Sequence, residues 1–164
     1  GKISFQQDGS RAAKFAVGLA GALYWRVDSR WPLGAALVLQ ELIPVTQFMA
    51  LELSFDFAVS LRKKFSHVNV IVGNAAELPT LLAGKKINTI ISSLPLLTLP
   101  IEERDKILAA IPSVLAPDGQ FIQYTYSLRK KNIFYPGNFL VKKTFIVWRN
   151  IPPARVTVFH IKSG

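Results

Sequence analysis

Apolar runs and segments with helical spacing alternate along most of this chain. Residues 48–51 are four apolar side chains in a row, without Gly or Pro, which is typical of a strand buried on both faces of a parallel sheet. The predicted strands of this part are residues 48–53, 68–72, 87–91 and 120–126. The predicted helices between them are residues 55–65, 77–82 and 101–115, the last bent or split at Pro112. This alternation predicts an α/β domain with a doubly wound, mostly parallel sheet.

The end of the chain predicts a different connection. Residues 139–147 and 154–161 are strand-like runs, and the short segment between them contains Pro152 and Pro153. Two strands joined by a short turn normally pair antiparallel. We therefore expect a C-terminal antiparallel hairpin at one edge of the sheet.

The beginning of the chain predicts helices. Residues 11–27 are rich in Ala and Leu and place apolar side chains at helical spacing, and residues 35–42 are good or fair helix formers. We therefore divide the chain into an N-terminal helical segment, residues 1–33, and an α/β domain, residues 34–164. The first helix either packs on the sheet or lies on a membrane surface with Trp25 as an interfacial anchor.

Composition narrows the possible partners. The chain has 164 residues, which predicts one domain, and its net charge of +10 favours an anionic partner, either nucleic acid or an anionic membrane surface. The absence of cysteine excludes disulfides and thiolate metal sites, and His67 and His160 lie far apart in sequence, so we expect no metal site. No apolar run reaches the length of a membrane span and no secretory signal is recognised. These features predict a cytoplasmic protein that contacts a membrane peripherally.

Polar residues follow three of the predicted strands. Glu52 lies at the end of the first apolar run, Asn74 follows the second strand, and Ser92 follows the third. Open α/β sheets bind ligands at the carboxyl ends of their strands. A carboxylate in the position of Glu52 commonly accepts hydrogen bonds from the two hydroxyls of a ribose.

Four motifs together carry a resemblance to a known family. They are LELSFDFA at residues 51–58, SSLPLLTLP at 92–100, QFIQYTY at 120–126 and VWRNIPPARV at 147–156. With the terminal hairpin, they resemble class I S-adenosylmethionine-dependent methyltransferases, which have a Rossmann-like fold. More narrowly, they resemble the bacterial phospholipid N-methyltransferases that methylate phosphatidylethanolamine. The resemblance covers residues 48–160 well and residues 10–47 poorly.

The resemblance implies a binding site for S-adenosylmethionine. In that site Glu52 binds the ribose hydroxyls, and Ala75 offers its backbone N–H group. Asn74 stands beside the adenine, where the family usually has Asp. Ser92 lies at the cofactor, and Gly34 is assigned to cofactor binding as a remnant of the family's Gly-rich loop.

The resemblance also implies how a methyl group would be transferred. Ser92, Ser93 and Leu94 line the methyl-transfer cleft, and a neutral amine attacks the sulfonium methyl by direct displacement. We expect the amine to be oriented by Ser93, the Leu94 carbonyl, Tyr124 and Tyr126. Basic residues that meet lipid phosphates would be Arg129, Lys130, Lys131, Lys142 and Lys143.

One part of the family pattern is missing from the sequence. The usual first strand and Gly-rich loop are not found, because Trp31-Pro32-Leu33 passes directly to Gly34. Three explanations remain open. The strand and loop are lost, they are replaced by the helix expected at residues 35–42, or residues of the natural protein are absent from this sequence.

Two other functions fit part of the pattern. Ribosomal RNA adenine N6-dimethylases share the layout and a basic charge, but they carry an aromatic residue where this loop has Leu96. We therefore expect an aliphatic or small-amine environment there instead of a stacked base. The third possibility is a non-catalytic remnant that binds membranes or a protein partner, and the missing Gly-rich loop supports it.

Overall fold

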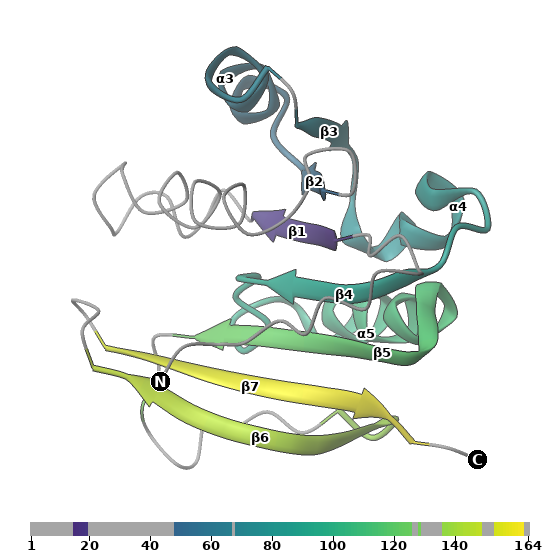
Figure 1. Cartoon of the computed structure of the whole chain (residues 1–164), viewed down its shortest axis with the longest axis vertical. Coiled ribbons are helices and arrows are strands. Elements are labelled where there is room, and N and C mark those ends of the chain that lie inside the picture. The colour runs from purple at the N-terminus through teal and green to yellow at the C-terminus, as the bar shows by residue number, and fades with distance from the viewer. Residues whose placement is uncertain are drawn as a thin grey trace, which may run out of the picture.

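The computed structural model describes residues 15–19, 48–66, 68–125, 128, 136–148 and 153–162. These residues form one seven-stranded sheet in the order β3-β2-β1-β4-β5-β7-β6, with helices packed on it (Figure 1). The strands are β1 (Phe15–Leu19), β2 (Phe48–Glu52), β3 (Asn69–Val72), β4 (Ile87–Ser92), β5 (Leu115–Thr125), β6 (Phe139–Val147) and β7 (Ala154–Ile161).

The sheet is mixed, with one reversed strand. The pairs β3-β2, β2-β1, β1-β4 and β4-β5 are parallel, whereas β7 pairs antiparallel with both β5 and β6. Strand β6 therefore runs in the direction of β5, and β7 alone runs against the others, as the arrows in Figure 1 show. The predicted α/β class and the C-terminal antiparallel pair are confirmed.

The structure differs from the sequence prediction at β1, where a helix was expected. The helix predicted for residues 11–27 is wrong at Phe15–Leu19, because this segment is an inner strand of the sheet and pairs in parallel with β2 and β4. Ladder hydrogen bonds on both sides outweigh the local helix preference of an Ala- and Leu-rich sequence. The strand that the sequence analysis found missing is thus present. The helix expected at residues 35–42 and the boundary expected after residue 33 lie outside the described residues.

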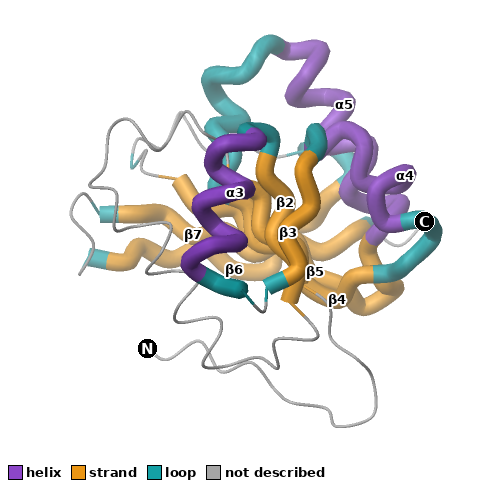
Figure 2. The backbone as a smooth tube through the Cα atoms, turned by 90° about the horizontal axis from the view of Figure 1, so that it is seen from above, coloured by secondary structure: helices purple, strands orange, loops and turns teal. Residues whose placement is uncertain are grey.

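Helices cover both faces of the sheet. They are α3 (Phe55–Lys64), the 3₁₀ helix η2 (Ala75–Glu77), α4 (Leu78–Leu82) and α5 (Ile101–Val114). In right-handed crossovers, the connection β2-α3-β3 and the connections through α4 and α5 use opposite faces of the sheet. Figure 2 shows α4 and α5 together, with α3 apart from them. Ser54 caps α3 as predicted, because its Oγ accepts a hydrogen bond from the Phe57 N–H at 3.4 Å.

Two predicted boundaries shift in the structure. Helix α5 continues through Pro112 to residue 114, so Pro112 does not split it. Strand β5 begins at Leu115 and takes in the expected Pro-Asp-Gly turn at residues 117–119. Its pairing with β4 jumps from Leu115 to Gln120 at this point, so the turn residues form an irregularity within the strand.

Three aromatic rings fix β5, β6 and β7 to one another. Phe121, Phe139 and Phe159 are buried, with ring centroids 5.5 to 6.1 Å apart. They belong to a core that also contains Ile107 and Ile111 of α5. Aromatic contacts at these distances add roughly 0.5–1.5 kcal/mol each beyond the burial of apolar area. This packing joins the C-terminal strands to helix α5 through one hydrophobic core.

Candidate functional site

The parallel register gathers the predicted site residues at one edge of the sheet. Glu52 ends β2 and pairs with Leu19 of β1, while Ser92 ends β4 and pairs with Gly18 of β1 and Gln123 of β5. Glu52 and Ser92 therefore flank the end of β1, two strand spacings or roughly 10 Å apart. At this point of the sheet the order of the strands changes direction, with β2 on one side of β1 and β4 on the other. Open α/β sheets bind their ligands at such a switch point.

Glu52 is a buried carboxylate that the backbone holds in place. Its side chain is 2% exposed, and its Oε1 accepts a hydrogen bond from the Ser54 N–H at 2.9 Å. Burial raises the pKa of Glu52, and hydrogen bonds from the Ser54 and Leu53 backbone partly oppose that rise. An ionised carboxylate accepts up to about four hydrogen bonds, so Glu52 retains capacity for hydroxyl donors.

Asn74 organises the loop that follows β3. Its Oδ1 accepts a hydrogen bond from the Ala76 N–H at 2.9 Å and so caps η2, whose first residue is Ala75. The loop lies against β2, because the Gly73 N–H donates to the Glu52 carbonyl oxygen at 3.0 Å. A Cβ atom on Gly73 would stand 2.7 Å from Leu81 Cδ1, so this close approach favours glycine. The roles of Asn74 and Ala75 beside an adenine remain predictions.

The loop after β4 folds back on its own backbone. Ser92 is buried, and its Oγ accepts a hydrogen bond from the Leu94 N–H at 3.2 Å. Ser93 and Leu94 are half-buried. Leu96 is buried in the hydrophobic core, which corrects the expectation that its side chain would form an aliphatic environment for the substrate.

Gln123 of β5 is a site residue that the sequence analysis missed. Its side chain is 7% exposed, and its Nε2 donates to the Leu94 carbonyl oxygen at 2.9 Å and to the Tyr124 carbonyl oxygen at 3.0 Å. Its Oε1 is buried and has no hydrogen-bond partner in the described part of the chain. An unsatisfied buried acceptor costs about 1–3 kcal/mol. A polar amide within the aromatic run QFIQYTY was the available signal.

Two further predicted site residues are Tyr124 and Gly34. Tyr124 is half-buried and follows Gln123 in β5, so the two side chains point to opposite faces of the sheet. Gly34 lies outside the described residues. The edge thus carries Glu52, Asn74, Ala75, Ser92, Ser93, Leu94 and Tyr124, while their roles as ligands stay predictions.

The buried Arg155 forms a hydrogen bond with the backbone just beyond β5. Arg155 of β7 pairs with Thr125 of β5, and its Nη2 donates to the Leu128 carbonyl oxygen. Arg155 belongs to the motif VWRNIPPARV, and its pairing with Thr125 places it at the same edge of the sheet. Hydrogen bonding from a guanidinium to a carbonyl oxygen is stronger than a neutral bond, and here it ties Leu128 to β7.

Metal ligands do not gather in the described residues. No group of three His, Cys, Asp or Glu side chains could hold a metal ion there. His160 lies on β7, where burial is the main cause that lowers its pKa, and His67 is not among the described residues. The expected absence of a metal site stays a prediction.

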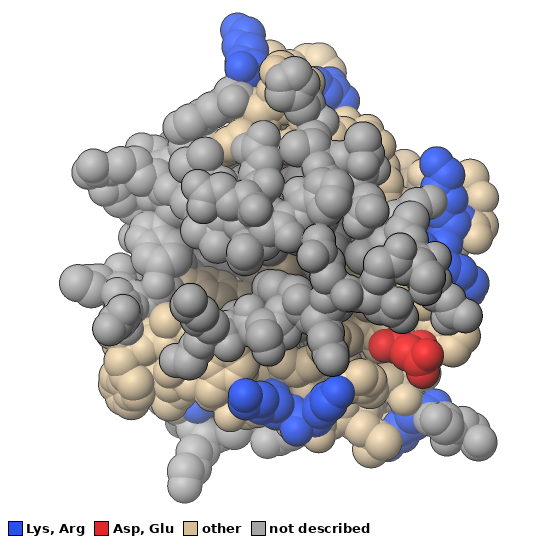
Figure 3. All heavy atoms as spheres, viewed as in Figure 1, with Lys and Arg blue, Asp and Glu red and all other residues tan. Residues whose placement is uncertain are grey.

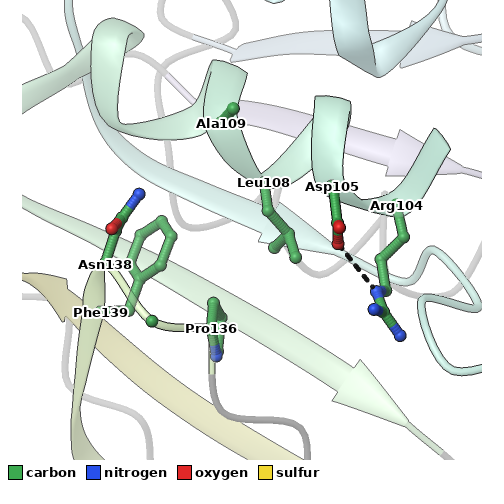
Figure 4. Close-up of a pocket in the computed structure, with 8 residues that line it drawn as sticks. Arg104, Asp105, Leu108, Ala109, Pro136, Asn138 and Phe139 are labelled. Atoms are coloured by element: carbon green, nitrogen blue, oxygen red, sulfur yellow. Dashed lines mark hydrogen bonds and ion pairs between the residues drawn. The ribbon is translucent and has the colours of Figure 1, made fainter. Parts of the chain in front are cut away.

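The cavity in Figure 4 lies away from this edge. It has a volume of about 330 Å³ and lies between α5 and the start of β6. Arg104 and Asp105 on one wall form an ion pair at 3.2 Å, and Phe139 lies on the other wall. None of the predicted site residues lines it, so it is separate from the candidate site.

Several exposed apolar side chains follow strands that end at the same edge as the candidate site. Of the seven large hydrophobic residues exposed in the described part of the chain, five follow strands at this edge. We call these five the apolar rim: Leu53, Phe55, Leu97, Ile101 and Trp148, with exposed fractions between 40% and 69%. Exposed hydrophobic residues that are gathered in one place mark an interaction surface more often than scattered ones do.

Positive charge is spread over the same molecule. The chain has 20 Lys and Arg against 10 Asp and Glu. On the face drawn in Figure 3, basic side chains lie at several places, including the lower part where β6 and β7 run. Lys142 and Lys143 of β6 are exposed. In the part of the chain that is described, no helix is both long and apolar enough to cross a bilayer.

One curated protein resembles the chain in sequence. It is the ornithine lipid N-methyltransferase of Singulisphaera acidiphila, 31% identical over 118 residues. The match covers 68% of this chain and 61% of the relative, so this chain spans less than two thirds of that protein's length. No protein-family model matches the chain.

Solved structures resemble the chain in fold. A TehB-like SAM-dependent methyltransferase from Corynebacterium glutamicum is 16% identical, with a TM-score of 0.59, and covers 92% of this chain and 82% of its own. A SAM-dependent methyltransferase from Anabaena variabilis is 11% identical, with a TM-score of 0.64 over 92% of this chain and 77% of its own. A Burkholderia thailandensis 1,6-didemethyltoxoflavin-N1-methyltransferase with bound S-adenosylhomocysteine is 15% identical, with a TM-score of 0.60 over 92% and 72%. The chain therefore has the Rossmann-like fold of class I methyltransferases.

Proposed function

We propose that this chain is an S-adenosylmethionine-dependent N-methyltransferase that acts on the amine head group of a lipid. The observation that carries the proposal is Glu52, a buried carboxylate at the end of β2 beside the switch point of the sheet. Burial of an ionisable group is costly, and groups of this kind are concentrated at functional sites.

The residues at the edge fit a nucleoside. The Glu52 carboxylate is fixed by the Ser54 backbone and can accept hydrogen bonds from two ribose hydroxyls. The loop at Asn74 and Ala75 lies next along the edge, at the distance of one strand. When bound, S-adenosylmethionine would supply an electrophilic methyl group close to the loop that contains Ser92, Ser93 and Leu94. The solved structures of the same fold support this cofactor.

A lipid substrate is supported by the surface of the molecule and by the curated relative. The apolar rim follows strands that end at the edge of the candidate site, and burial of large apolar side chains stabilises binding by about 1.5–3 kcal/mol each. The basic charge favours an anionic membrane surface. The relative acts on ornithine lipid, and phosphatidylethanolamine carries the same kind of acceptor, a primary amine on a lipid. Peripheral membrane binding on the cytoplasmic side belongs to this proposal.

The test is methyl transfer to defined vesicles. Purified protein is incubated with labelled S-adenosylmethionine and vesicles of phosphatidylglycerol mixed with phosphatidylethanolamine, ornithine lipid or phosphatidylcholine. We expect methylated product from the two amine lipids and none from phosphatidylcholine, whose nitrogen has no lone pair. Methylation of a ribosomal RNA transcript, with no lipid product, would contradict the lipid proposal and support the nucleic-acid alternative.

A rim variant separates membrane access from cofactor binding. Phe55 is 65% exposed at the start of α3, so Phe55→Ser should leave the fold and the affinity for S-adenosylhomocysteine unchanged. We expect its activity on vesicles to fall about tenfold, since one large apolar contact with the bilayer is lost. Leu140→Ser is the matched control, because Leu140 is also exposed but lies near the beginning of β6, away from the rim. Equal activity of both variants and the unaltered protein would count against the apolar rim.

A further inference from the structure

Gln123 is held in one orientation by two carbonyl groups. Its Nε2 donates to the carbonyl oxygens of Leu94 and Tyr124, and both of these groups can only accept. The amide nitrogen must therefore face them, and Oε1 must face the other way. The orientation of this side chain does not depend on any ligand.

The acceptor that this arrangement leaves is buried and unused. Oε1 of Gln123 has no hydrogen-bond partner among the described residues, although the side chain is only 7% exposed. Buried acceptors are paired in the great majority of native structures, so an orphaned one requires an explanation. A ligand that carries an N–H or O–H donor would satisfy it.

This acceptor belongs to a side chain that contacts the loop after β4. Gln123 pairs with Ser92 across the sheet and contacts the Leu94 carbonyl, so its amide lies at the loop where methyl transfer is proposed. The Leu94 carbonyl itself already accepts hydrogen bonds from the Leu96 N–H at 2.8 Å and from Gln123 Nε2. Both of its lone pairs are engaged, whereas Oε1 of Gln123 is an acceptor that no described residue uses.

We infer that Oε1 of Gln123 accepts a hydrogen bond from the N–H of the amine substrate and so selects acceptors that still carry an N–H. This inference rests on the proposed function. The amine lone pair forms the new C–N bond while the C–S bond breaks and its electron pair stays on sulfur, giving S-adenosylhomocysteine and a methylammonium. The methylammonium loses one proton to solvent before it can react again. An acceptor bond to the N–H turns the lone pair toward the methyl group, and a neutral amide does so without stabilising the unreactive ammonium as a carboxylate would.

If Gln123 has this role, the rate of methylation depends on whether the neutral amine substrate still has an N–H group. Primary and secondary amines can donate to Gln123, whereas a tertiary amine has no N–H when it is neutral. The N-monomethyl lipid should therefore react faster than the N,N-dimethyl lipid, and this preference should depend on Gln123.

The experiment compares these two acceptors in anionic vesicles of phosphatidylglycerol. For the unaltered protein and Gln123→Met, the kcat/KM for N-monomethyl- and N,N-dimethyl-phosphatidylethanolamine is measured, and S-adenosylhomocysteine titration reports the fold of the cofactor site. We expect the monomethyl-to-dimethyl ratio to fall about fivefold to tenfold in Gln123→Met, the loss of one hydrogen bond. Gln120→Met, on the same strand, should leave the ratio unchanged.

A ratio is insensitive to loss of folded protein, because partial unfolding lowers both rates equally. An unchanged ratio in Gln123→Met, with S-adenosylhomocysteine still bound, would overturn the role of Gln123 and leave the proposed function intact. No methyl transfer to any amine lipid by the unaltered protein would overturn both.

Discussion

At the scale of a single residue, burial disfavours the ionised form of the Glu52 carboxyl group. Its carboxyl group is buried beside a strand end, and burial raises its pKa above the ordinary value of 4.5. Protonation is therefore favoured in the folded state. The contribution of this group to stability is fully present below about pH 4.5 and is lost as the pH rises through the folded-state pKa. At neutral pH the ionised carboxylate opposes folding, which a structural role alone would not favour.

Removal of this charge should stabilise the protein. Glu52→Gln keeps the shape of the side chain and an oxygen that accepts from the Ser54 N–H. We expect a higher urea midpoint at pH 7 for the variant, and a difference that shrinks as the pH falls toward 4. Glu77→Gln, at an exposed carboxylate, should change the free energy of unfolding by less than about 0.5 kcal/mol. A lower midpoint for Glu52→Gln at pH 7 would show that the charge is satisfied within the protein.

At the scale of the element, α4 ends in a strained residue. Ala83 is its C-cap and has φ 48° and ψ 48°, the left-handed conformation that favours glycine. We expect Ala83→Gly to raise the free energy of unfolding by about 0.5–1 kcal/mol. Ala109→Gly is the control, because Ala109 is an exposed residue within α5, where glycine should lower stability by about 1 kcal/mol. Chemical denaturation measures both, and a destabilised Ala83→Gly would contradict the account of this cap.

The elements of residues 48–161 could be predicted from sequence because their signals are local. Ser54 caps α3, and apolar runs mark β2, β3 and β4. Strand β1 could not be predicted in this way, since its five residues lie in an Ala- and Leu-rich stretch and become a strand by pairing with β2 and β4 far along the chain. Its alternation is too short to outweigh helix propensity.

The residues of the candidate site also divide into those with a local sequence signal and those that depend on a distant contact. Glu52, Asn74 and Ser92 could be predicted because each follows a strand whose carboxyl end meets the same edge. Gln123 could not, because its significance depends on a hydrogen bond to Leu94, 29 residues earlier in the chain. The unused Oε1 acceptor of Gln123 can be recognised only when the positions of Gln123 and the Leu94 carbonyl are both known.

At the scale of the whole molecule, one side of the sheet combines several properties. The carboxyl edge carries the buried Glu52, the orphaned acceptor of Gln123 and the exposed apolar rim. The aromatic rings of Phe121, Phe139 and Phe159 belong to the hydrophobic core and join β5, β6 and β7. A protein that met a bilayer through this edge would present its proposed methyl-transfer site directly to lipid head groups, and the basic charge would strengthen that orientation.

The most direct test of this account is calorimetric titration of the purified protein with S-adenosylhomocysteine, with Glu52→Gln in parallel. We predict binding of about micromolar strength, and a loss of at least about tenfold in Glu52→Gln, since a charge-assisted bond to a ribose hydroxyl is worth about 1.5–3 kcal/mol. Because hydroxyl donors favour the ionised carboxylate, affinity should rise as the pH increases through the pKa of Glu52. No binding by the folded protein, or equal binding by Glu52→Gln, would contradict the proposed cofactor site.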